Sequence, residues 1–171
     1  MNPMADPHRA AAPATLRPND AATLRAEAER LQRDAAAGVL TPMLRGKRIA
    51  LLCERATDAD AVLFERAATE LGAQVSHIRP SLLEGPSALE TAHTARLLGR
   101  LYDAVECQGV AAERVQLLRD AAGVPVFDGL AVAAHLAAQF VDADGPGTAP
   151  TADEQHFRLQ ALLLARLASG Y

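Results

Sequence analysis

The chain has 171 residues, of which half are hydrophobic, and its 21 acidic and 17 basic residues give a net charge of −4. This length suits one well-packed domain and is short for two. The acidic balance and the lack of a Lys/Arg-rich run argue against a nucleic-acid partner. The sequence has no apolar segment near the roughly 18 residues of a membrane span and no apolar core of signal-peptide type. We therefore expect a cytoplasmic, soluble globular protein without a membrane partner.

The first predicted structured element is a helix that follows an Ala- and Pro-rich start. Residues 1–18 are expected to form a flexible tail. Asn19 and Asp20 are candidate caps for the helix, which ends at Gly38. Its predicted apolar stripe consists of Leu24, Ala28, Leu31 and Ala35.

The middle of the chain alternates strands and helices. The strand predicted over Arg48–Cys53 contains the run IALLC, whose apolar residues on both faces are typical of a strand inside a parallel sheet, and a helix over Asp58–Leu71 follows it. The alternation then continues with strands over Gln74–Ile78, Asp103–Cys107 and Val124–Phe127, and with helices over about Ala88–Leu101, Ala111–Ala122 and Leu130–Val141. The predicted inward residues are Val62, Leu63, Ala67 and Leu71 on the second helix, and Leu89, Ala92, Leu97 and Leu101 on the third. This order predicts an α/β fold: a single doubly wound domain with a parallel four-stranded sheet flanked by helices.

The end of the chain is predicted to return to this domain. The DADGPGTAP stretch is a linker by composition. We divide the chain into a tail at 1–18, a domain at 19–142, a linker at 143–151 and a C-terminal helix within 152–171 that belongs to the same domain. The helix is expected over Asp153 to about Ala168, with an apolar face of Phe157, Leu159, Leu162, Leu163 and Leu167.

Four phrases of the sequence carry a resemblance to a known family. LRGKRIALLCE, FERAATELGAQV, TARLLGRLYDAVE and AAGVPVFDGL resemble the amino-terminal domain of ornithine carbamoyltransferases, whose architecture aspartate transcarbamoylases share. The resemblance runs from about Ala21 to Asp142 and implies a carbamoyl phosphate-binding domain. In the family a second domain binds the amino acid, and we expect this chain to lack it. The closing DEQHFRLQALLLARL resembles the family's final helix, which packs back on the first domain.

The phosphate loop of the family differs strongly in this sequence. The family motif Ser-Thr-Arg-Thr-Arg aligns with Thr57, Asp58, Ala59, Asp60 and Ala61. Both arginines are replaced by alanine and two neutral residues by aspartate, so the bidentate guanidinium contacts to phosphate are lost. Structurally, Thr57 could instead be an N-cap with Asp60 at N3, as in a capping box.

The other family anchors are also replaced. The arginine after the third strand aligns with Gln108, and the arginine that starts the final helix aligns with Gln155. The His-Pro-Thr-Gln motif aligns with His135, Leu136, Ala137 and Ala138, so only its histidine remains. A lone helical histidine is more often packed or partly exposed than catalytic. We therefore predict a degenerate carbamoyl phosphate pocket without catalytic residues.

The remaining ionisable and thiol residues suggest no replacement site. Cys53 and Cys107 are expected to be buried reduced thiols, because a metal site of Cys53 with His77 lacks supporting ligand spacing. Glu54 and Glu106 could face each other at the carboxyl edge of the sheet, near Arg55 and Glu65. With Asp58 and Asp60 they could hold a hard cation, but a solvated acidic rim is the favoured interpretation. No metal or cofactor is predicted.

The leading functional hypothesis is a carbamoyltransferase-like pseudoenzyme that serves as a non-catalytic interaction or regulatory module. Family analogy suggests a homo-oligomer, namely a trimer, and a true carbamoyltransferase is a candidate protein partner. One alternative is a binder of small molecules or cations that reuses the acidic pocket. Another is a transferase half that works with a separately encoded amino acid-binding domain.

Overall fold

The computed structural model describes residues 18–83, 85, 87–141 and 151–168, so nearly all of the predicted tail and of the predicted linker lies outside the described residues. The elements are, in chain order, α1 (Pro18–Ala36), β1 (Arg48–Leu52), α2 (Ala59–Glu70), β2 (Gln74–Ile78), the 3-10 turn η1 (Pro80–Leu83), α3 (Ala88–Leu101), β3 (Ala104–Cys107), α4 (Ala112–Ala122), β4 (Val126–Asp128), α5 (Leu130–Val141) and α6 (Ala152–Ala168). They agree with the predicted elements to within two residues at most ends. α1 already includes Asn19 and Asp20, so the prediction that these residues cap it is wrong.

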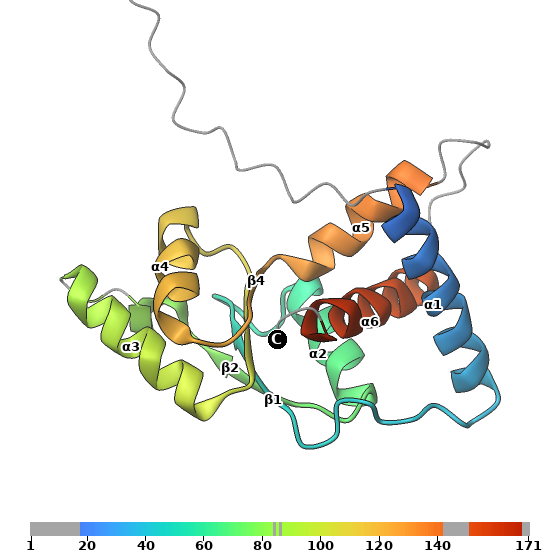
Figure 1. Ribbon diagram of the computed structural model, residues 1–171, viewed down its shortest axis with the longest axis horizontal. Coiled ribbons are helices and arrows are strands. Elements are labelled where there is room, and N and C mark those ends of the chain that lie inside the picture. Colours follow the sequence, from blue (N-terminus) through green and yellow to red (C-terminus); the bar gives the residue numbers. More distant parts are fainter. Residues whose placement is uncertain (1–17, 84, 86, 142–150, 169–171) are drawn as a thin grey trace, which may run out of the picture.

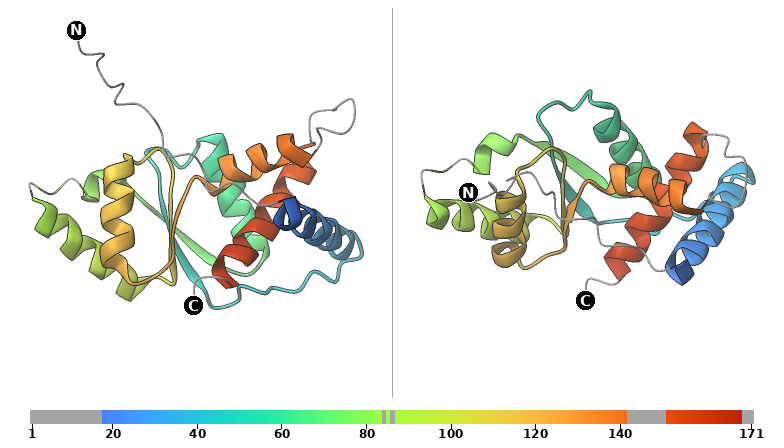
Figure 2. Two further views of the ribbon diagram at one scale, coloured as in Figure 1. Left: turned by 45° about the horizontal axis from the view of Figure 1, so that its top comes forward. Right: turned by 90° about the horizontal axis from the view of Figure 1, so that it is seen from above.

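The sheet is parallel throughout and has the strand order β2-β1-β3-β4. Helices α3 and α4 lie on one face, and α1, α2, α5 and α6 lie on the other (Figures 1 and 2). The inner strand β1 is buried by helices on both sides from Ile49 onward, which is why its sequence is a continuous apolar run, whereas the edge strand β2 is exposed or half-buried. The prediction of a doubly wound α/β domain is confirmed.

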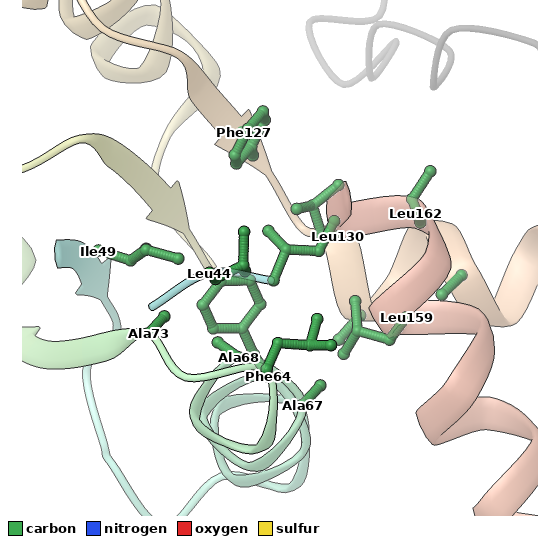
Figure 3. Close-up of a cluster of buried hydrophobic side chains, with 14 of the residues drawn as sticks. Leu44, Ile49, Phe64, Ala67, Ala68, Ala73, Phe127, Leu130, Leu159 and Leu162 are labelled. Carbon is green, nitrogen blue, oxygen red and sulfur yellow. The ribbon is translucent and has the colours of Figure 1, made fainter. Parts of the chain in front are cut away.

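Two hydrophobic clusters form the core, one on each face of the sheet. The larger cluster lies between the sheet and helices α1, α2, α5 and α6. Phe64 of α2 lies in this cluster near Leu130 and Leu159 (Figure 3). The smaller cluster lies between the sheet and helices α3 and α4, around Leu52, Val105 and Leu118. Cys53 belongs to the first cluster and Cys107 to the second, so the two thiols lie on opposite faces.

The closing helix α6 packs on the domain, beside α1, α2 and α5 (Figure 1). Its start is a capping box, because Glu154 N–H donates to Thr151 Oγ1 at 3.2 Å and Thr151 N–H donates to Glu154 Oε2 at 2.7 Å. Leu159 and Leu163 are fully buried, as predicted. A polar contact that the sequence did not suggest joins α6 to α2: His156 Nε2 lies 2.6 Å from Glu70 Oε2.

The predicted inward face of α3 is largely wrong, whereas that of α2 is right for Ala67 and Leu71 and wrong for Val62. On α2, Val62 is half exposed while Phe64 and Ala68 are buried. On α3 the predicted Leu89, Leu97 and Leu101 are exposed, and the buried residues are Thr91, Ala95 and Leu98. The reason lies at Gly99, where an added Cβ would meet the carbonyl oxygen of Ala122 at 1.7 Å. The close approach to α4 requires the side of α3 that carries Gly99, so Leu89, Leu97 and Leu101 face outward.

Within the described part of the chain, no helix is both long enough and apolar enough to cross a membrane.

Candidate functional site

The candidate site lies at the carboxyl edge of the sheet, where β1 leads through a short turn into α2. This is the edge at which open α/β sheets bind ligands, and a helix N-terminus there offers unpaired N–H groups to anions. The helix begins at Ala59 with Asp58 as its N-cap, and the Asp58 side chain makes no capping hydrogen bond. The predicted capping box of Thr57 and Asp60 is therefore wrong, because the helix starts one residue later than that pattern requires.

The Asp58 carboxylate is turned toward a neighbouring cation instead of the helix. Arg55 Nε donates to Asp58 Oδ1 at 2.9 Å, and the guanidinium is largely exposed. An exposed pair of this kind contributes little to stability. The pair matters for ligand binding, because Arg55 already has a carboxylate partner and is less able to bind an anion at the helix start.

The rest of the loop separates into exposed and buried positions. Ala59 and Asp60 are exposed, whereas Ala61 is fully buried against the core. Gln108, which follows β3, donates from Nε2 to the Asp60 carbonyl at 3.2 Å. The structure thus brings Gln108 to the start of α2, where it binds the backbone of the loop.

The predicted residues of α5 and α6 form a second contact. His135 is exposed on α5, and its Nδ1 lies 3.5 Å from Nε2 of Gln155 on α6. Ala138 lies one turn further along α5, where the structure describes the backbone alone. Neither side chain of this pair carries the permanent positive charge that an arginine would provide.

Glu106 occupies a place that sequence reasoning assigned wrongly. It is completely buried on β3, between Leu51 and Phe127 in the strand register, and does not belong to a solvated rim facing Glu54. Oε1 accepts a hydrogen bond from the Leu130 N–H at the start of α5, at 2.8 Å. Burial raises the pKa of Glu106 to about 8, and the nearby Asp128 charge acts in the same direction. The Glu106 carboxyl thus accepts from the first N–H of α5, and its burial keeps it from contacting a ligand in solvent.

Within the part of the chain that the structure describes, the thiols and acidic residues do not assemble a metal centre. Both cysteines are free and buried, as predicted. Among the described residues, no group of three or more His, Cys, Asp or Glu side chains could hold a metal ion. The cation site considered from Glu54, Glu106, Asp58 and Asp60 is not supported, because Glu106 is buried and Asp58 pairs with Arg55.

Comparison with known proteins identifies the family. Residues 11–143 match the family described as aspartate/ornithine carbamoyltransferase, carbamoyl-P binding domain. The ornithine carbamoyltransferase of Haemophilus influenzae strain PittGG is 43% identical over 100 residues, which are 58% of this chain and 30% of that enzyme. The ornithine carbamoyltransferase of Cutibacterium acnes is 40% identical over 106 residues, which are 62% of this chain and 32% of that enzyme. The matched part of this chain thus corresponds to about a third of these curated relatives.

Solved structures show the same fold. The ornithine carbamoyltransferase of Pyrococcus furiosus superposes with a TM-score of 0.61 at 23% identity, over 74% of this chain and 42% of that one. The aspartate transcarbamoylase catalytic subunit of M. jannaschii gives a TM-score of 0.59 at 16% identity, over 74% of this chain and 44% of that one. The chain therefore belongs to the aspartate/ornithine carbamoyltransferase family, and residues 11–143 are its carbamoyl phosphate-binding domain.

Proposed function

We propose that this domain does not bind carbamoyl phosphate at the start of α2 and acts as a non-catalytic interaction or regulatory module. The observation that carries the proposal is the charge at this helix start. Asp58 occupies the N-cap position, Asp60 lies in the first turn, and positions 59 and 61 are alanine. A helix N-terminus attracts an anion, but two carboxylates beside it oppose one.

The electrostatic cost is large compared with ordinary ligand affinities. A unit charge 4 Å from another interacts by about 4 kcal/mol at an effective dielectric of 20, so a carboxylate near a phosphate dianion disfavours binding by several kcal/mol. A millimolar ligand gains only about 4 kcal/mol in total. Arg55 compensates little, because it is exposed and already paired with Asp58.

A restored loop tests this interpretation. The triple variant Asp58→Thr, Ala59→Arg, Asp60→Thr removes both carboxylates and adds an arginine at an exposed position. Ala61 is left unchanged, because an arginine there would overpack the core. We expect the triple variant to bind inorganic phosphate at least about tenfold more tightly than the wild type, measured by calorimetry. The variant Ala59→Gln, which adds length without charge, is the matched control and should bind no better than the wild type.

The interaction role is supported by an apolar surface on α3. Leu89, Leu97 and Leu101 of this helix are exposed, and Leu82 of the adjoining η1 is also exposed. Apolar side chains gathered in this way on a protein surface often mark an association site. We propose that a second copy of the chain covers this surface, which we call the α3 leucine surface, in a homo-oligomer.

The oligomeric state can be measured directly. The wild type should elute as an oligomer in size-exclusion chromatography with light scattering, and the variant Leu97→Glu, Leu101→Glu should elute as a monomer. Val132→Glu changes an exposed apolar residue of α5 and should leave the assembly unchanged. A wild-type monomer at tens of micromolar would refute self-association through this surface.

The alternative of a transferase half that works with a separate amino acid-binding domain requires carbamoyl phosphate to bind here. Binding of that ligand by the wild type would favour this alternative over the proposed function. The same titration therefore decides between them.

A further inference from the structure

Three side chains from different parts of the fold form a connected chain beside α2. Cys53 follows β1, His77 lies on β2, and Glu65 lies on α2. Cys53 Sγ is 3.5 Å from His77 Nδ1, and His77 Nε2 is 2.9 Å from Glu65 Oε2. A nucleophile, a base and a group that orients the base are arranged in this order in enzymes that use an activated nucleophile.

The parallel register explains why the contact forms. Leu51 pairs with His77 in the sheet, and the Cys53 N–H donates to the Ile78 carbonyl at 3.2 Å. The thiol is therefore held beside the imidazole by the backbone of the sheet. α2 crosses the same face and brings Glu65 to the other side of the ring.

The hydrogen bonds assign the roles within the chain. The Glu65 carboxylate is an acceptor, so His77 Nε2 carries the proton that it donates. Nδ1 of the neutral ring is then the acceptor for the Cys53 S–H. Glu65 thus acts as a positioning residue that holds the basic nitrogen toward the thiol.

The surroundings of the thiol limit what it can react with. Cys53 is 5% exposed, which restricts the site to small reagents. Burial raises the pKa of the Cys53 thiol, and the carboxylates of Asp58, Glu54 and Glu65 act in the same direction. The thiol accordingly remains protonated near neutral pH and needs a base in order to react, while the same three carboxylates attract a cation.

We propose that Cys53, His77 and Glu65 form a thiol-exchange site for small cationic disulfides such as aminoalkyl disulfides. The Cys53 sulfur attacks one sulfur of the disulfide while its proton passes to His77 Nδ1. The S–S bond of the reagent breaks, and the leaving thiolate takes the proton from the imidazolium. The products are a mixed disulfide on Cys53 and one free thiol, so no further oxidant is needed.

The charge preference can be tested on the unaltered protein with a matched pair of reagents. Aminoethyl and sulfonatoethyl methanethiosulfonate share one leaving group, methanesulfinate, and differ in the sign of their charge. Peptide mapping by mass spectrometry gives separate rates for Cys53 and Cys107, and a cysteine in an unstructured peptide corrects for intrinsic reactivity. Cys107 is the internal reference, because it is fully buried and burial raises its pKa to about 12.

At low salt we expect Cys53 to react at least about tenfold faster with the cationic reagent than with the anionic one, and the ratio should fall as salt is added. We also expect it to react at least tenfold faster than Cys107. Equal rates with the two reagents, or a Cys53 rate as slow as that of Cys107, would overturn the proposal.

Two variants separate the base from the charge. His77→Asn keeps the carboxylates, so it should slow both reagents about tenfold or more with the charge preference unchanged. Glu65→Gln can still accept from Nε2 but loses a charge, so it should weaken the preference and largely retain the rate. In the wild type, the rate constant for Cys53 modification should reach a plateau at a pH below that at which the thiol itself ionises. In His77→Asn, this rate constant should keep rising with pH. An unchanged rate in His77→Asn with Cys107 still protected would refute the role of the base.

Discussion

The buried carboxyl of Glu106 makes the stability of this domain depend on pH. Its side chain is fully buried beneath α5, one oxygen accepts from the Leu130 N–H, and the other has no hydrogen-bond partner within the described chain. Burial raises its pKa from 4.5 to about 8. We therefore predict that Glu106→Gln, which keeps the shape and the acceptor for Leu130, stabilises the protein at alkaline pH.

The sign and size follow from proton linkage. Between the two pKa values the folded state holds a proton on Glu106 that the unfolded state has lost, so stability falls as pH rises. Each pH unit in this window costs about 1.4 kcal/mol. The loss is absent below pH 4.5, grows to about 4 kcal/mol near pH 7.5, and is complete at about 5 kcal/mol above pH 8.

Urea unfolding followed by circular dichroism measures this directly. The free energy of unfolding of Glu106→Gln minus that of the wild type should increase by about 3 kcal/mol from pH 5.5 to pH 7.5. Glu113→Gln, an exposed change in the first turn of α4, is the control and should give a difference that does not vary with pH. If the Glu106→Gln difference were equally flat, this carboxyl would not be protonated in the folded protein and the reasoning would be wrong.

Two further predictions concern the packing of helices. Gly99→Ala should lower the free energy of unfolding by about 3 kcal/mol in urea titrations, because its Cβ would overlap the Ala122 carbonyl oxygen; a loss below 0.5 kcal/mol would mean that α3 shifts freely on α4. His156→Ala should cost about 2–4 kcal/mol, because it empties a buried position and removes the contact to Glu70 that joins α6 to α2. Increased proteolysis within α6 in this variant would locate the loss, whereas unchanged stability would contradict a structural role for the contact.

Much of the fold could be predicted from local features of the sequence. The apolar run of Arg48–Cys53, the glycines that end helices and the regular alternation of elements lead to a parallel α/β sheet, because strands buried on both faces have few other arrangements. The family resemblance placed the closing helix back on the domain. These features depend on periodicity and chain order, which the sequence contains.

The wrong predictions concern residues whose burial depends on contacts between elements that are distant in the sequence. α3 has an apolar stripe of leucines, and the sequence alone favours burying it. The close contact of Gly99 with α4 selects the opposite side of the helix. Similarly, the position of Glu106 near the end of a strand suggests exposure to solvent. In the structure α5 covers it, and the Leu130 N–H donates to its carboxyl.

The candidate site was predictable in composition but not in its contacts. The alanines at positions 59 and 61, where the family resemblance implies arginines, can be read from the sequence, whereas the burial of Ala61 and the pairing of Asp58 with Arg55 cannot. The contact of Cys53 with His77 depends on the register between β1 and β2, which the residue types do not determine. The loss of positive charge at this site therefore stays a prediction from the resemblance, and the hydrogen-bonded chain of Cys53, His77 and Glu65 was not predicted.

The central claim is that the start of α2 has lost its affinity for carbamoyl phosphate. The most direct test is calorimetric titration of the wild-type protein with carbamoyl phosphate, with inorganic phosphate as the control ligand. The account predicts no binding heat for either ligand at millimolar concentration. Micromolar binding of carbamoyl phosphate would contradict it, because another group would then be replacing the lost arginines and the domain would still hold the substrate of a transferase.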